Sequence, residues 1–160
     1  MNYMAVIKEL LDGVVYEKPV PSINHARVGK NIIDFFEDVN ARTEKLYLDD
    51  KNEPIPDIVV GDLDLIVEIM SPETVKNDRF YKKDLYQRHG VKEYWIVDDE
   101  KLSVEVYWLS GKEYVLHDVF VMLQRSDTVC FRTTVNGFLG EIIDLKDIFA
   151  DVYESILERS

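Results

Sequence analysis

Residues 56–98 restrict the fold more than any other part of this chain. Two short runs, residues 58–60 and 63–70, are rich in β-branched and aliphatic residues and are separated by Gly61 and Asp62. Runs of this length and composition, bounded by turn-forming residues, are typical of buried strands. We therefore expect two adjacent strands that are joined around Gly61 and Asp62.

Glu68 places a charge inside the second of these runs, in the sequence VEIM. Because side chains alternate between the two faces of a strand, Asp64, Ile66, Glu68 and Met70 are expected on one face. A buried carboxylate is costly unless it has a partner. Two interpretations remain open at this point: an ion pair with a lysine or arginine, or a metal site shared with Asp57.

A basic helix is predicted after the second strand. Residues 77–89 have a helical pattern that ends at Gly90, and residues 76–92 carry six basic side chains against two acidic ones. The whole chain has 31 acidic and 19 basic residues, a net charge of −12, which argues against broad nonspecific nucleic-acid binding. The local excess of base is either a solvated helix face or a surface that faces phosphate.

The remaining elements complete an α/β or α+β domain with a mixed sheet. We expect the following: a strand at 13–16, a helix capped by Ser22 or Asn24 and running to Val39, a strand at 45–48, strands at 93–98 and 103–109 with a turn near residues 98–101, a hairpin around Ser110 and Gly111, and a helix at 145–157 that buries Leu145, Ile148, Phe149, Val152 and Ile156.

Length and composition exclude several classes of protein. With 160 residues and 46% hydrophobic content, residues 1–160 are expected to form one globular domain. The longest clean apolar run, residues 119–123, is far shorter than the ~20 residues of a membrane helix. The N-terminus lacks a signal-peptide pattern, and the single Cys130 suits a reducing cytoplasm. His89 and His117 show no metal-ligand spacing with Cys130, so no zinc site is expected.

Asp57 and Glu68 have the chemistry of a hard-cation site. Adjacent strands lie ~4.8 Å apart, so carboxylates at matching heights can share one ion. Mg²⁺ typically takes one or two carboxylates, keeps several waters and accepts phosphate oxygens from a substrate. A lysine from the next helix would orient the attacking water and stabilise developing charge. Such triples also occur by chance, so spacing alone does not decide the matter.

The sequence also resembles a known family through six blocks. They are ELLDGVVY at 9–16, PSINHARVGKNI at 21–32, PDIVV at 56–60, LIVEIMSPET at 65–74, DRFYKKDLYQRHGVKEYWIVD at 78–98 and EIIDLKDIF at 141–149. Together they resemble the Uma-type putative restriction endonucleases, a branch of the PD-(D/E)XK nuclease superfamily. The resemblance implies a restriction-endonuclease-like fold, in which helices flank a mixed central sheet.

The resemblance also implies roles for individual residues. Asp57 matches the aspartate of the PD motif, and Glu68 matches the acidic residue of the (D/E)XK motif. Met70 stands where the superfamily's standard pattern has lysine. In the Uma-type branch the lysine is thought to move to the following helix, where Lys82 matches. Lys83 is adjacent in sequence but is rotated by about 100° around a helix and should point elsewhere.

Three further residues have open interpretations. Glu9 matches the additional acid that many such nucleases place on their first helix, or it is a surface-helix glutamate. Asp64 falls in an unusually short link between Asp57 and Glu68, where it would compete with Asp57 as a ligand. His25 is interpreted as a capping or core residue. Tyr86, one turn from Lys82, is interpreted as a core residue that could border the site.

The leading hypothesis is therefore a Mg²⁺-dependent endonuclease acting on DNA, with Mn²⁺ as a possible substitute. Asp57 and Glu68 would bind the metal, Lys82 would orient the water, and Glu9 would assist. A homodimer is expected because cleaving both strands of a duplex calls for two sites. One alternative is a nuclease fold that has lost turnover and serves as a protein-interaction module. Another is a purely structural ion pair between Glu68 and Lys82.

Overall fold

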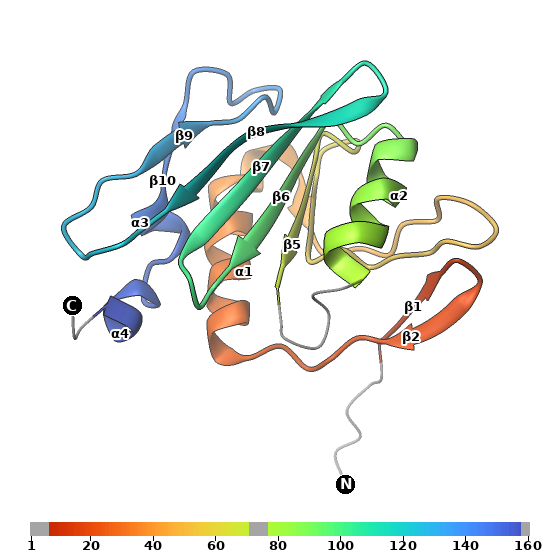
Figure 1. Ribbon diagram of the computed structural model, residues 1–160, viewed down its shortest axis with the longest axis horizontal. Coiled ribbons are helices and arrows are strands. Elements are labelled where there is room, and N and C mark those ends of the chain that lie inside the picture. The colour runs from red at the N-terminus through yellow and green to blue at the C-terminus, as the bar shows by residue number, and fades with distance from the viewer. Residues whose placement is uncertain (1–6, 71–76, 158–160) are drawn as a thin grey trace, which may run out of the picture.

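A six-stranded mixed sheet forms the centre of the molecule (Figure 1). The computed structural model describes residues 7–70 and 77–157, with side chains described from Phe80 onward in the second range. The strands follow the spatial order β3 (Ala41–Arg42), β4 (Ile58–Val60), β5 (Leu65–Ile69), β6 (Glu93–Asp98), β7 (Ser103–Ser110) and β8 (Glu113–Val121). Strands β5 and β6 are parallel, and the other neighbours are antiparallel. The predicted mixed α+β class is confirmed.

Two small sheets and several short helices surround this centre. The small sheets are the β1–β2 hairpin (Lys8–Leu11 and Val14–Glu17) and the β9–β10 pair (Cys130–Arg132 and Ile142–Asp144). The helices are α1 (Ile23–Phe35), η1 (Glu37–Val39), the π-helix η2 (Asn77–Lys82), α2 (Lys83–Arg88), α3 (Leu145–Ile148) and α4 (Tyr153–Leu157). Across residues 7–70 and 77–157, no helix is long and apolar enough to cross a membrane.

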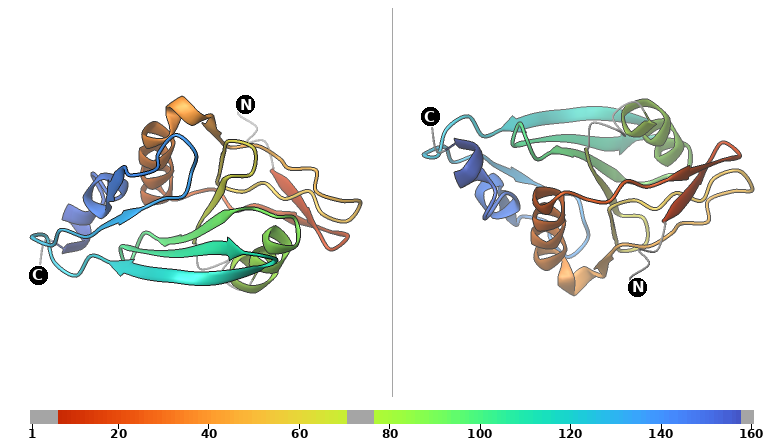
Figure 2. Two further views of the ribbon diagram at one scale, coloured as in Figure 1. Left: turned by 90° about the horizontal axis from the view of Figure 1, so that it is seen from above. Right: turned by 90° about the horizontal axis from the view of Figure 1, so that it is seen from below.

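Alternate residues of β5 face two different hydrophobic cores. Val67 packs with Val28 and Ile32 of α1, whereas Ile66 packs with Leu85 of α2. Because consecutive strand residues point to opposite faces, α1 and α2 cover opposite sides of the sheet. Figure 2 shows α1, α3 and α4 on one side of strands β6 to β8. Strand β5 is buried on both faces, which explains its nearly continuous apolar sequence.

The predicted turn between β4 and β5 is confirmed, although β5 begins at Leu65 rather than at residue 63. Gly61 and Leu63 both adopt positive φ angles, of 63° and 57°. The left-handed backbone at Leu63 cannot belong to a strand, so the turn takes two more residues than the sequence suggested. Ile58 pairs with Val67, and this register continues outward to bring Asp57 opposite Glu68.

Helix α1 begins as predicted. Ser22 caps it by accepting a 3.1 Å hydrogen bond from the backbone N–H of His25. Its α-helical part ends at Phe35, and the 3-10 turn η1 continues to Val39, the residue at which the helix was expected to stop. The cap places the first turn of α1, with His25, against the open end of the β4–β5 pair.

The structure differs from the sequence predictions at residues 45–48 and 145–157. Residues 45–48 are not a strand, because Leu46 and Leu48 hydrogen-bond to Pro54 and Asn52 in a local loop. The predicted helix at 145–157 is broken in two at Asp151, whose φ of 66° is incompatible with a continuous right-handed helix. Its second half, α4, packs against the core only through partly buried residues, and Ile156, which was expected to be buried, is 39% exposed.

Candidate functional site

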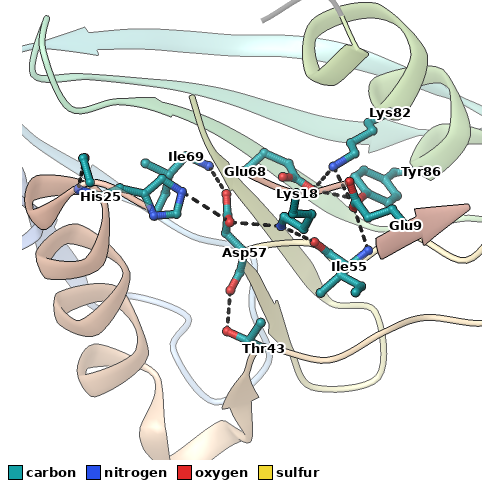
Figure 3. Close-up of polar contacts among 11 residues, drawn as sticks. Glu9, Lys18, His25, Thr43, Ile55, Asp57, Glu68, Ile69, Lys82 and Tyr86 are labelled. Carbon is teal, nitrogen blue, oxygen red and sulfur yellow. Dashed lines mark hydrogen bonds and ion pairs between the residues drawn. The ribbon is translucent and has the colours of Figure 1, made fainter. Parts of the chain in front are cut away.

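A cavity of about 660 Å³ lies where the first turn of α1, the segment after β2 and the open end of the β4–β5 pair meet. All four predicted site residues, Asp57, Glu68, Lys82 and Glu9, line it, as do Lys18 and His25. Figure 3 shows these side chains converging from β1, the β2–α1 segment, α1, the β4–β5 pair and the helix that carries Lys82. The fold thus gathers three acids, two lysines and a histidine at one place.

Asp57 is held by donors on both of its carboxylate oxygens (Figure 3). Oδ2 accepts a 2.7 Å hydrogen bond from the backbone N–H of Ile69 on the neighbouring strand. Oδ1 lies 3.3 Å from Lys18 Nζ and 3.3 Å from His25 Nε2. The Asp57 carbonyl accepts a bond from the Thr43 hydroxyl, which fixes the backbone as well. The carboxylate therefore has a defined orientation toward the cavity.

These contacts shift the acidity of both Asp57 and His25. Burial acts to raise the pKa of Asp57, but the His25 hydrogen bond, the charges of Lys18 and His25 and the Ile69 N–H outweigh it and lower the pKa to about 2. For His25, burial acts to lower the pKa, and the hydrogen bond and charge of Asp57 outweigh it, so the pKa is raised. The structure therefore favours a charged Asp57–His25 pair.

Glu68 is almost completely buried, at 1% exposure, on the face of β5 that α2 covers. Its Oε1 accepts a 2.8 Å hydrogen bond from the Tyr86 hydroxyl and lies 3.5 Å from Lys82 Nζ. Burial and the negative charge of Glu68 together raise the pKa of Tyr86 well above its usual value. Tyr86 is therefore a hydrogen-bond donor that touches a site carboxylate, as well as a core residue.

Lys82 joins two of the acids in the buried half of the site. Its ammonium donates a 2.9 Å hydrogen bond to Glu9 Oε1, and its side chain is 2% exposed. The same Glu9 oxygen accepts a 2.8 Å bond from the backbone N–H of Ile55. The expectation that Glu9 lies on a helix is wrong: it lies on β1 and is buried, because pairing with β2 turns alternate residues of β1 toward the cavity.

The Ile55 peptide connects the two halves of the site. Its N–H binds Glu9, and its carbonyl oxygen accepts a 2.5 Å hydrogen bond from Lys18 Nζ. With His25 charged, the three acids Glu9, Asp57 and Glu68 are balanced by two lysines and the imidazolium, so the side chains of the site sum to zero charge. The backbone of Ile55 therefore links Glu9 to Lys18, and through Lys18 to Asp57, without adding charge.

Asp64 does not take part in this site. It lies at the turn end of the β4–β5 pair, where its N–H bonds to the carbonyl of Val60 and its side chain pairs with Lys92 at 3.0 Å. The possibility that it competes with Asp57 is therefore excluded by position. The two aspartates sit at opposite ends of the same short hairpin.

Much of the predicted basic helix is engaged within the protein. Lys83 Nζ lies 4.2 Å from the centre of the Tyr107 ring, in agreement with the prediction that it points away from the site. Arg88 pairs with Asp84, and Lys92 pairs with Asp64. Lys82 is also buried and paired. Most of the described basic side chains of this region therefore contact other groups of the protein.

The donor set fits a hard divalent cation that keeps some of its water. Asp57, directly before β4, and Glu68 on β5 supply two carboxylates, the number that Mg²⁺ typically takes from a protein. In the described ranges, no three or more His, Cys, Asp or Glu side chains are grouped to enclose a metal. An ion held by these two carboxylates would have to complete its shell with water or other oxygen ligands.

Sequence reasoning missed Lys18. It lies between β2 and α1, in the turn sequence KPVPS, where no spacing relates it to the acids. Its role depends on a contact across 39 residues with Asp57. A general rule says that a buried carboxylate is usually paired with a cation. This rule favours a basic partner for Asp57 but does not indicate which residue it would be.

Comparisons with known proteins place the chain among nuclease-like folds. A family model described as "Uma2: Putative restriction endonuclease" matches residues 4–138. The chain is also similar to a crystal structure described as a putative nuclease belonging to DUF820 from Anabaena variabilis. That similarity has a TM-score of 0.66 and 20% identity over 93% of each chain. No curated protein matches the sequence.

Proposed function

Because the chain belongs to the Uma2 family of putative restriction endonucleases, we propose that it is a metal-dependent nuclease that hydrolyses phosphodiester bonds in DNA. The main support is the convergence of Asp57, Glu68 and Lys82 at one cavity, from positions up to 25 residues apart in sequence. These are the residue types that phosphodiester hydrolysis requires: two metal-binding carboxylates and a fixed cation.

In this proposal Asp57 and Glu68 hold Mg²⁺, for which Mn²⁺ can substitute. When bound, the metal ion would lower the pKa of a bound water and offset negative charge on the phosphate. The Ile69 N–H and the Tyr86 hydroxyl orient the two carboxylates by hydrogen bonds of 2.7 and 2.8 Å. Such supporting partners restrict the rotation of ligand side chains.

Lys82 is assigned to orient the attacking water. Glu9 and Glu68 hold its ammonium at the cavity wall, which restricts the directions in which its N–H groups can point. In the reaction, the water oxygen forms a bond to phosphorus as the ester P–O bond breaks, the attacking water gives up a proton to solvent, and the leaving oxygen takes up a proton from solvent. The buried Lys82 ammonium donates to the water and stabilises the charge that develops on the phosphate. Glu9 acts as the positioning residue for Lys82.

Plasmid nicking tests this assignment. Purified protein is incubated with supercoiled DNA and Mg²⁺ or Mn²⁺, alongside Asp57→Asn, Glu68→Gln and Lys82→Met. Each variant should lose at least about 100-fold in rate, since each removes a group that acts on the transition state. Lys83→Met is the matched control and should retain activity. Unchanged nicking in the three site variants would show that the activity comes from elsewhere.

A second candidate function is protein interaction without turnover. It is favoured by one observation: both Asp57 and Glu68 already have cationic partners, Lys18 and Lys82, within the protein. The net charge of −12 also suits a protein partner better than a nucleic acid. Calorimetry with Mn²⁺ separates the two functions. A nuclease should bind Mn²⁺ and lose that binding in Glu68→Gln, whereas an interaction module should show no such loss.

A purely structural ion pair between Glu68 and Lys82 is the third candidate. It predicts that Mg²⁺ and Mn²⁺ leave the melting temperature unchanged, since an ion that does not bind the folded state cannot stabilise it. A melting temperature that rises with Mn²⁺ concentration in the wild type, and not in Asp57→Asn, would exclude it.

We further propose that the active form is a homodimer in the cytoplasm. Cleavage of both strands of a duplex with one site per chain calls for two chains related by a twofold axis. A single cysteine, which is exposed, suits a reducing compartment. Sedimentation velocity over a range of concentrations tests the dimer, and a monomer with full double-strand cleavage would contradict it.

A further inference from the structure

The ammonium of Lys18 is contacted by two oxygen atoms. Its Nζ lies 2.5 Å from the carbonyl oxygen of Ile55 and 3.3 Å from Asp57 Oδ1. The side chain is 16% exposed and lines the cavity. A carbonyl and a carboxylate oxygen at the edge of a water-accessible cavity are also the ligands that a hard cation prefers. The Lys18 ammonium therefore occupies a position that would also attract a hard metal cation.

A metal ion that binds Asp57 through Oδ1 has to compete with the cations that already contact this oxygen. Oδ2 accepts from the Ile69 N–H, and Oδ1 faces both Lys18 and His25. Ile69 is held by the pairing of β5 with β6, and His25 has a short side chain on the capped first turn of α1. Lys18, on a flexible four-carbon stem at the cavity wall, is the partner that can leave.

We propose that Lys18 competes with a divalent metal ion for Asp57, serving as the counter-ion of this carboxylate until the metal displaces it into the cavity. The inference rests on the proposed function, because it takes Asp57 to be a metal ligand. Metal binding at this site is then an exchange of one cation for another.

The charges around Asp57 favour this exchange. With His25 charged, the three acids, the two lysines and the imidazolium sum to 0, so a divalent ion would bring the cluster to +2 and the departure of one ammonium would lower it to +1. An ammonium beside a divalent cation is repelled, and the cavity gives it an open path away. Lys82 is 2% exposed and is held by Glu9, so the more exposed Lys18 is the one that moves. The released ammonium then faces the space in which a substrate phosphate would lie.

The test measures Mn²⁺ affinity by calorimetry on the full chain. Lys18→Met removes the competing charge and keeps the aliphatic stem, so its Mn²⁺ affinity should rise by about tenfold or more. Lys92→Met is the matched control, because it makes the same change in net charge and also breaks a lysine–aspartate pair, at the far end of the same hairpin. Its Mn²⁺ affinity should stay within about twofold of the wild type.

Lys18→Arg supplies a variant whose expected effect has the opposite sign. A guanidinium forms stronger, bidentate contacts with a carboxylate than an ammonium does, so Mn²⁺ should bind several-fold more weakly. Loss of the fold cannot produce tighter binding in one variant and weaker binding in the other. If Lys18→Met proves too unstable to purify, the arginine variant alone decides, and equal or tighter Mn²⁺ binding by it overturns the proposal.

The outcomes separate this inference from the proposed function. If Asp57→Asn and Glu68→Gln leave Mn²⁺ binding intact, the metal site itself is wrong and both proposals fall. If they abolish binding while Lys18→Met binds Mn²⁺ no more tightly than the wild type, the metal site stands and the competition by Lys18 is overturned. Tighter binding in Lys18→Met than in Lys92→Met supports it.

Discussion

Lys82 Nζ lies 2.9 Å from Glu9 Oε1, although 73 residues separate the two in the chain. Both side chains are buried, at 2% and 7% exposure, and Glu68 lies 3.5 Å from the same ammonium. Charges this deep are tolerated because they neutralise each other, and removing one partner leaves the others uncompensated. The site is therefore coupled to the stability of the fold.

Lys82→Met is expected to lower the free energy of unfolding by about 3–5 kcal/mol, because it leaves Glu9 and Glu68 buried without their cation. Urea denaturation at neutral pH measures the loss. Lys83→Met makes the same change one residue away, where the ammonium lies over the Tyr107 ring, and should cost only about 1 kcal/mol. Equal losses in the two variants would show that the buried ion pairs add no stability of their own.

Asp57 should make the stability of the protein depend on acidic pH. Its pKa is lowered from 3.8 to about 2 in the folded state, so its contribution is complete above about pH 4 and is lost as the pH falls toward 2. The amount is on the order of 2 kcal/mol. Denaturation of the wild type and Asp57→Asn between pH 2 and pH 5 tests this, and parallel pH profiles would contradict it.

His25 should titrate above its usual pKa of 6.5, because Asp57 favours the charged imidazole. Its contribution to stability is present below pH 6.5 and is lost as the pH rises through the folded-state pKa. An NMR titration of the imidazole measures the value directly. Asp57→Asn removes the two largest effects that raise this pKa and leaves burial and the charge of Lys18, which lower it, against the charge of Asp99 alone, so the pKa should fall below that of the wild type. A pKa that does not change between the two proteins would rule out this coupling.

Glu93 is a buried carboxylate outside the site, and the contacts that the structure describes for it are hydrogen bonds from neutral groups. It is fully buried and accepts hydrogen bonds from the Trp95 indole, the Thr133 hydroxyl, and the N–H and hydroxyl of Thr134. Glu93→Gln points an amide donor at other donors and should cost about 2–3 kcal/mol in thermal or urea unfolding. Glu113→Gln, at an exposed position on β8, should change stability by less than about 0.5 kcal/mol.

Local sequence signals predicted the elements whose structure depends on nearby residues. The β-branched runs around Gly61 became β4 and β5, the hairpin at Ser110 and Gly111 formed, and Ser22 caps α1. Propensity, turn chemistry and capping act over a few residues, so they can be recognised in a single sequence.

The same signals failed where distant contacts decide the outcome. Glu9 was placed on a helix, but pairing of β1 with β2 made it a strand residue that faces Lys82. Residues 45–48 resemble a strand in composition, yet they bond locally to residues 52–54. Asp64 had the right residue type for the site, and the length of the hairpin took it to the opposite end.

The sequence by itself determined the mixed α+β class, the two strands that carry Asp57 and Glu68, and the helix that supplies Lys82, because patterning and motif blocks are local properties of the chain. Only the tertiary structure decided which cation faces each acid. Lys18 reaches Asp57 across 39 residues, and Lys82 reaches Glu9 across 73. Charge pairing acts through space over a few ångströms. The partners are therefore determined by how the sheet, the β1–β2 hairpin and α1 pack, and they cannot be read from spacing along the chain.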